Sequence, residues 1–158
     1  MFYNNADKTQ NTDVLTGEQK DRAYAGWFTA DQQFTSVDGS KRGLYGFTNI
    51  SFHDTAVNKI DNTQQIGIRY LGLLDNHPND ILGLGMNRIH VNDRYRDGIY
   101  NTKALINEDA EYNIEVNYSN YVTPWLMLRP VVQYVIQPGA TDQVDNALVL
   151  GLTTKVIF

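Results

Sequence analysis

The chain has 158 residues, a net charge of −5 and no cysteine, which suits one domain and excludes disulfide and thiolate chemistry. Its acidic balance argues against a nucleic-acid partner. The mean hydropathy of −0.41 and the lack of any apolar run of about 20 residues exclude a helical membrane protein. A membrane barrel of strands stays possible, because half of each strand there faces a polar lumen.

Seven runs of alternating apolar and polar residues predict β-strands. In chain order they are 22–34, 43–53, 63–74, 81–91, 110–122, 125–137 and 146–158. The opening "MFYNN" would fit the end of a further strand. Each run exceeds the length of about 5–6 residues typical of globular strands and reaches the roughly 9–11 that a tilted strand needs to cross a bilayer. No segment of useful length has a helical period, although residues 101–112 could form a short turn in a loop.

The links between these strands broadly alternate in length. The short links are 35–42, 75–80 and 123–124, and the longer ones include 92–109 and 138–145. Outer-membrane barrels have short periplasmic turns and longer external loops. The alternation therefore predicts that the short links lie on the periplasmic side.

Within each run, the two faces differ in chemistry. In 110–122 one parity is apolar, whereas the other carries Glu111, Asn113, Glu115, Asn117 and Ser119. The terminal run "DNALVLGLTTKVIF" repeats the division, since one parity holds Leu148, Leu150, Leu152, Val156 and Phe158. We therefore expect an apolar face towards lipid and a polar face towards a water-filled lumen.

Three features interrupt the pattern. Arg88 and His90 fall on the apolar parity, so the lipid-facing surface should end, bend or rise above the bilayer there. Pro130 lies inside a predicted strand, where it removes one ladder hydrogen bond and favours a broken ladder or a bulge. Gly83 and Gly85 form a lone G-x-G without the rest of a nucleotide fingerprint, and they suggest close strand packing or a bend.

Four segments resemble the carbohydrate-selective porins of the OprB family. They are "RGLYGFTNISF", "DILGLGMNRIHVNDRYR", "VTPWLMLRPVVQYVIQPG" and "DNALVLGLTTKVIF", in the order of the family's C-terminal half. The resemblance implies an all-β antiparallel transmembrane barrel of about sixteen strands in the bacterial outer membrane, with sugars as solutes and no cofactor. Residues 1–158 would supply one barrel segment, about half of it, as a fragment of a longer chain with a signal peptide. It also implies that the assembly machinery reads Phe158.

Eight polar-face residues are candidates for lining the pore and contacting sugar: Asp31, Asn49, Arg69, Glu111, Glu115, Arg129, Gln133 and Lys155. Charged members would set the field, and amides would offer paired donors and acceptors. Trp27 and Phe47 share this parity and could present ring faces. For each single residue, a plain solvated wall position is the competing interpretation.

Enzyme hypotheses receive little support. Glu111 and Glu115 would lie roughly 13 Å apart along one strand, beyond the ~5–9.5 Å of glycosidase carboxyl pairs. The three histidines show no metal-ligand spacing. Two alternatives to a porin stay open: a small eight-stranded structural or adhesive outer-membrane barrel, and a soluble ligand-binding β-barrel.

Overall fold

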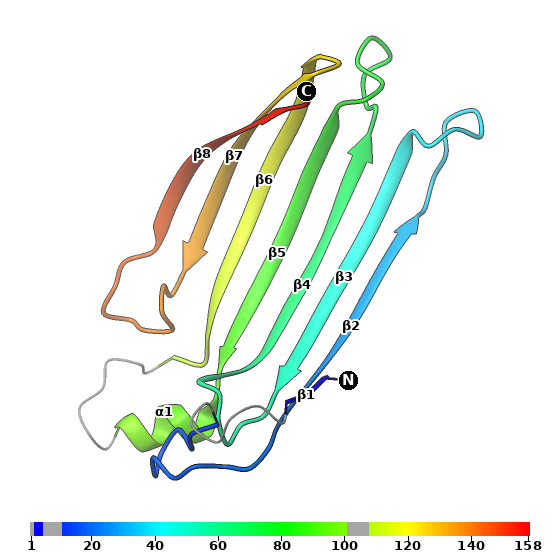
Figure 1. The fold of residues 1–158 in the computed structure, drawn as a ribbon. Helices are drawn as coiled ribbons and strands as arrows, with labels where there is room; N and C mark the ends of the chain where they lie inside the picture. The colour runs from blue at the N-terminus through cyan, green and yellow to red at the C-terminus, as the bar shows by residue number, and fades with distance from the viewer. Residues whose placement is uncertain (1, 5–10, 101–107) are drawn as a thin grey trace.

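The computed structural model describes residues 2–4, 11–100 and 108–158. These form one antiparallel sheet in which the strand order follows the chain from β1 to β8 (Figure 1). The strands are β1 (Phe2–Asn4), β2 (Ala23–Gln33), β3 (Gly43–His53), β4 (Ile60–Leu71), β5 (Ile81–Val91), β6 (Ala110–Thr123), β7 (Leu126–Ile136) and β8 (Ala147–Val156). The predicted all-β antiparallel fold is confirmed.

Strand register keeps the two faces separate across the whole sheet. Following the paired positions from β2 to β6 gives Asp31, Phe47, Gly67, Gly85 and Glu115, all odd-numbered. Register shifts occur only near strand ends, between Ile60 and Asn62 and between Tyr121 and Thr123. Because side chains alternate along a strand, the odd-numbered residues of the central strands share one face.

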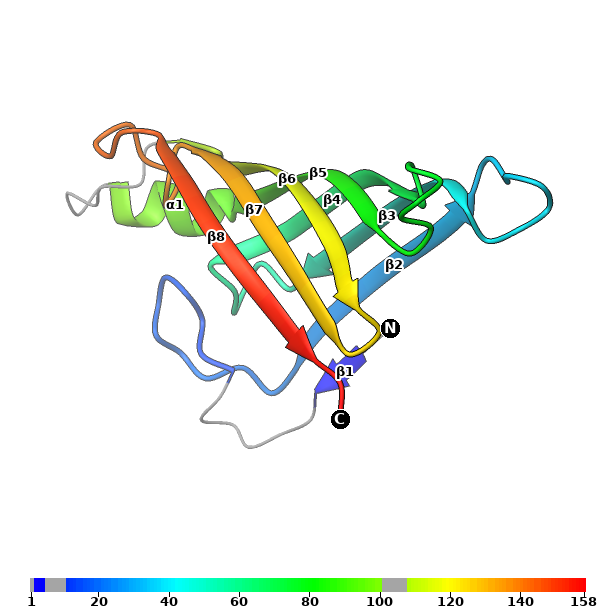
Figure 2. The ribbon, with the colours of Figure 1, turned by 90° about the horizontal axis from the view of Figure 1, so that it is seen from above.

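The opposite face is apolar and exposed. Leu150 is 73% exposed, Ile66 59% and Phe28 58%, although each is a large hydrophobic residue. Among the described residues, the only buried apolar side chains are Val91, Ala110 and Ala140. A soluble sandwich would bury this face against a second layer, and the described residues contain none. The strongly curved single sheet is visible in Figure 2.

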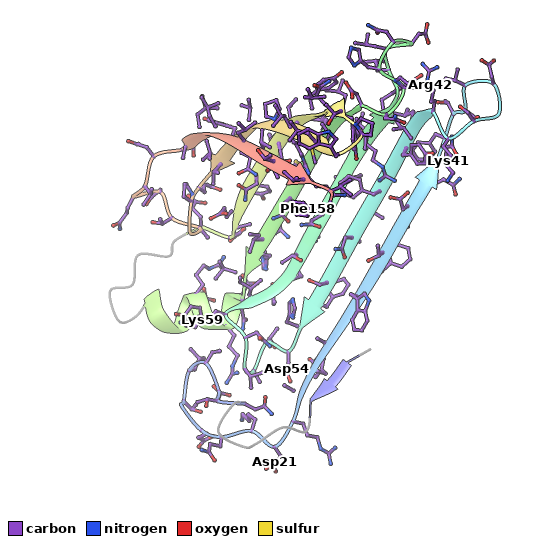
Figure 3. The ribbon with its side chains drawn as sticks, turned by 45° about the horizontal axis from the view of Figure 1, so that its top comes forward. Asp21, Lys41, Arg42, Asp54, Lys59 and Phe158 are labelled. Atoms are coloured by element: carbon purple, nitrogen blue, oxygen red, sulfur yellow. The ribbon has the colours of Figure 1, made fainter. Side chains whose placement is uncertain are left out.

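Successive links lie at alternate ends of the strands. The links 34–42, 72–80 and 124–125 lie at one end, and the 54–59 link, α1 and the 137–146 link lie at the other (Figure 1). Lys41 and Arg42 mark the first end in Figure 3, whereas Asp21, Asp54 and Lys59 lie at the second. The predicted alternation in length does not hold throughout, because the 54–59 link is shorter than the 34–42 and 72–80 links at the opposite end. The assignment of the two ends to the two sides of the membrane stays a prediction.

One helix, α1 (Asp93–Tyr100), was not anticipated from the sequence. Asn92 caps it, since its Oδ1 accepts the Arg94 N–H at 3.0 Å. The Asn92 amide also donates to the carbonyls of Thr55 and Asn58, each at 2.7 Å. Eight residues are too few for a periodic signal to be recognised in the sequence, and the buried Asn92 cap fixes where this helix begins. No helix in the described ranges is long and apolar enough to cross a membrane. The turn expected within 101–112 falls largely outside the described residues.

Strand β4 is displaced from its predicted range of 63–74. It ends at Leu71 because Gly72 has a φ of 66°, which turns the chain out of the sheet. Leu73 and Leu74 continue the apolar run but lie in the turn. At the other end, β4 begins at Ile60, among polar residues that the alternation did not include.

The interruptions seen in the sequence have specific structures. At the end of β5 near α1, the apolar face gives way to polar residues. His90 lies there, and its Nδ1 is 2.6 Å from Oδ1 of Asp61, at the bulge of β4. Opposite Pro130, the β6–β7 pairing passes from Asn117–Val131 to Asn120–Leu128 without a register shift. Pro130 therefore accompanies a short gap in one ladder and no bulge.

The carboxylate of Asp80 fastens the 72–80 turn to β6. It is 3% exposed and accepts hydrogen bonds from the Tyr118 hydroxyl at 2.7 Å, the Asn120 amide at 2.7 Å and the Tyr121 N–H at 2.8 Å. Burial alone would raise the pKa of this carboxyl. The three hydrogen bonds outweigh burial, so that the pKa lies below its ordinary value of 3.8.

Replacing the Asp80 carboxylate should lower the free energy of unfolding and should make that free energy less dependent on pH. Because the folded pKa is depressed, the contribution of Asp80 is complete above pH 3.8 and disappears as the pH falls through the folded value. We expect Asp80→Asn to lose roughly 2–3 kcal/mol near neutral pH and to lose less than the parent on acidification. Urea unfolding between neutral pH and pH 3 measures both effects. Asp75→Asn, at a carboxylate whose side chain is 97% exposed, is the control and should change little.

A charge on the apolar face should be more costly than the same charge on the polar face. Leu150→Arg is expected to destabilise by about 2–4 kcal/mol if the residue lies near mid-bilayer. Its neighbour Val149 points to the opposite face, so Val149→Arg is the matched control and should retain most of the stability. Unfolding in lipid vesicles measures the difference, and equal losses for the two variants would contradict the assignment of the faces.

Candidate functional site

All eight predicted residues lie at odd-numbered positions of the described strands and share the polar face of the sheet: Asp31, Asn49, Arg69, Glu111, Glu115, Arg129, Gln133 and Lys155. They do not form one cluster. Two groups are joined by charged hydrogen bonds, and the others lie singly along the strands.

The first group joins β2 to β4 across β3. Arg69 donates two hydrogen bonds to the Asp31 carboxylate, at 2.6 and 2.9 Å. The guanidinium of Arg69 also lies 4.8 Å from the centre of the Tyr45 ring. Two parallel hydrogen bonds fix both geometry and charge, so this pair is an ordered element of the wall.

The second group surrounds Glu115 on β6. Its carboxylate accepts hydrogen bonds from Gln133 at 2.6 Å, Asn117 at 2.7 Å and Arg129 at 3.0 Å. Asn117 was not among the predicted site residues, although it shares their parity. These donors come from β6 and from β7, so the cluster also fixes side-chain positions across the β6–β7 pair.

The remaining predicted residues lie away from both groups. Glu111 accepts the Gly139 N–H at 2.7 Å, which ties the 137–146 link to β6. Asn49 interacts with Thr29 at 3.3 Å and with Gln65 at 3.4 Å. Lys155 lies near the end of β8 and is exposed. A structural role for Glu111 is therefore visible in addition to its predicted place on the wall.

A recess of about 590 Å³ separates the two groups. Its lining includes Phe47, Gly83, Gly85, Glu115 and Arg129. Gly83 and Gly85 of β5 line it directly, so backbone rather than side chain forms this part of the floor. Gly67 of β4 pairs with Gly85 but does not itself line the recess. Gly83 and Gly85 were interpreted from sequence as packing or bending positions. The structure shows that Gly85 leaves space on the polar face and that the Asn117 side chain lies close to Gly83.

Phe47 lies over part of this floor. A Cβ atom added at Gly67 would lie 2.6 Å from both Cε1 and Cζ of the Phe47 ring and 2.7 Å from the Leu84 carbonyl oxygen. A Cβ atom at Gly83 would meet the Asn117 amide oxygen at 2.9 Å. Gly67 is thus required by its neighbours. In the sequence, Gly67 and Gly85 are only two glycines of polar-face parity on successive strands. They could not be recognised as neighbours without the register that pairs them.

Two buried polar atoms beside the recess have no hydrogen-bond partner within the described part of the chain. They are Asn87 Oδ1, an acceptor, and Arg129 Nε, a donor. No group of three or more His, Cys, Asp or Glu side chains in that part could hold a metal ion. The polar face therefore presents hydrogen-bonding groups, compensated charges and aromatic rings, among them Trp27, Tyr45 and Phe47.

Comparison with known proteins assigns the family. Residues 2–158 match the carbohydrate-selective porin, OprB family. The chain belongs to the OprB family. Porin B of Pseudomonas aeruginosa is 44% identical over 145 residues, covering 84% of this chain and 32% of that protein. The putative porin QuiX of Acinetobacter baylyi is 35% identical over 173 residues, covering 99% of this chain and 39% of the relative.

Solved OprB structures agree with this fold. The high-pH structure of Pseudomonas putida OprB superposes with a TM-score of 0.86 at 38% identity, covering 98% of this chain and 42% of that one. Its low-pH structure gives 0.63 at 36% identity, covering 85% of this chain and 36% of that one. The chain thus spans about a third to two-fifths of the length of these OprB and porin relatives. Family membership places it among outer-membrane proteins of Gram-negative bacteria.

The paired glycines Gly67 and Gly85 of this OprB chain should differ in their tolerance of a methyl group. Gly67→Ala must displace the Phe47 ring and a backbone carbonyl, whereas a Cβ at Gly85 has its nearest atoms at 3.7 Å. We expect Gly67→Ala to destabilise by roughly 1–3 kcal/mol, the usual cost of overpacking, and Gly85→Ala to change stability little. Thermal unfolding of the two variants in one detergent gives the comparison. Equal stability would contradict the position of Phe47.

Proposed function

We propose that this chain forms part of the wall of a water-filled channel through which uncharged sugars diffuse. The observation that carries the proposal is the charge balance of the polar face. In the described strands it holds three acidic and three basic side chains: Asp31, Glu111, Glu115, Arg69, Arg129 and Lys155. The whole chain has a net charge of −5, so its excess negative charge lies elsewhere.

Local pairing supports a neutral solute. Asp31 binds Arg69 and Glu115 binds Arg129, so four of the six charges are compensated within hydrogen-bonding distance. A wall of this kind offers donors and acceptors without a strong field of one sign. Weak, distributed hydrogen bonding allows a hydroxyl-rich solute to enter and to leave, which diffusion through a channel requires.

The family description supports carbohydrate as the solute class, and the two relatives are named as porins. We further propose that residues 1–158 act as one barrel segment without separate domains. Sugar contact by the eight residues, and reading of Phe158 by the assembly machinery, stay predictions. Phe158 itself lies two residues beyond β8 and is fully exposed.

Removal of each charge of the Glu115–Arg129 pair in turn tests the channel. We use the protein as extracted from the outer membrane and inserted in planar bilayers. Glu115→Gln should shift ion selectivity towards anions, Arg129→Gln should shift it towards cations, and the double variant should return close to the parent. Both changes lie on the polar face and should leave the folded fraction unchanged.

Asp38→Asn in the exposed 34–42 link is the control and should leave selectivity unaltered. Uptake of glucose into vesicles measures solute passage in parallel. A parent protein that neither conducts ions nor admits glucose would overturn the proposed function.

A further inference from the structure

We propose that the glycine-floored recess is a binding subsite for one ring of a neutral sugar, and that Gly85 sets its width. This inference rests on the proposed function and adds a location and a specificity-determining residue to it. The recess has about 590 Å³, within the range of about 300–1,000 Å³ usual for small-molecule sites.

The recess combines two surfaces that suit opposite parts of a sugar. Phe47 contributes an aromatic ring at its β3 side, where apolar C–H groups can pack. The Glu115 cluster lies across the recess on β6 and β7 and is polar. A sugar ring has C–H groups and hydroxyl groups and can satisfy both surfaces at once.

Charge compensation argues in the same direction. The Arg129 and Glu115 side chains that line the recess already bind each other at 3.0 Å. Arg69, which also lines it, is held by Asp31. A charged solute would gain little from these pairs, whereas a neutral ligand does not have to disrupt them.

At Gly85 the recess is open although no close neighbour requires a glycine there. A Cβ atom there would have only ordinary contacts, with the Ile66 carbonyl oxygen and the Phe47 Cζ at 3.7 Å. A larger residue would therefore fit the strand and project into the recess. Gly26 on β2 is the control, because a Cβ atom there would have no described atom within 4 Å and the residue does not line this recess.

The experiment compares Gly85→Val with Gly26→Val, both in the protein extracted from the outer membrane. The readout is the reduction of ion current by added glucose in planar bilayers. We expect the glucose concentration for half-reduction to rise about tenfold in Gly85→Val, equivalent to the loss of one or two hydrogen bonds. Gly26→Val should stay within about twofold of the parent, since Gly26 shares the apolar face with Phe52 and lies outside the recess.

Phe47→Leu keeps an apolar side chain over Gly67 but removes the aromatic ring, and it tests the subsite if Gly85→Val does not fold. It should also raise the half-reducing concentration. An unchanged concentration in whichever of these recess variants folds, or an equal rise in Gly26→Val, would overturn the subsite. A parent that conducts and admits glucose but shows no current reduction would also overturn it, and would leave the proposed channel standing.

Discussion

Hydrocarbon supplies no hydrogen-bond partner for a peptide group, and this constraint governs the structure. Each long strand must bind its neighbours over nearly its whole length, and β2 to β8 do so in one uninterrupted antiparallel order. Continuous pairing fixes the register, and the register fixes the faces. The separation of Leu150 from Val149, or of Ile66 from Gln65, is thus a consequence of backbone pairing as much as of side-chain preference.

Pairing across strands also organises the polar face. Asp31 and Arg69 meet although β3 lies between their strands, because Asp31 pairs with Phe47 and Arg69 pairs with Tyr45, two residues away on the same face of β3. Glu115 gathers donors from its own strand and from β7. The glycines of β4 and β5 then leave the middle of the wall without side chains. Ordered charge pairs beside an open floor give this family member a recess rather than a uniformly lined surface.

Much of the strand layout and the division into two faces could be predicted from the sequence, because residues alternate between apolar and polar when the two faces of a strand meet lipid and water. This alternation placed β3 and β5 at their observed bounds and put all eight candidate residues on one face. It failed where other forces define the chain. Gly72 ended β4 inside an apolar run, and the buried cap Asn92 created a helix in a polar loop. The Asp31–Arg69 pair and the glycine floor depend on register, which one strand's sequence does not contain.

The positions of the two bulges bear on how this chain can change in length. An extra residue in the middle of a strand would exchange lipid-facing and lumen-facing side chains from that point to the strand's end. The bulges at Ile60–Asn62 and Tyr121–Thr123 lie next to links, where an added residue is absorbed before it reaches the central band. Insertions and deletions among homologues should therefore collect at strand ends and links, while the central band changes by substitution alone.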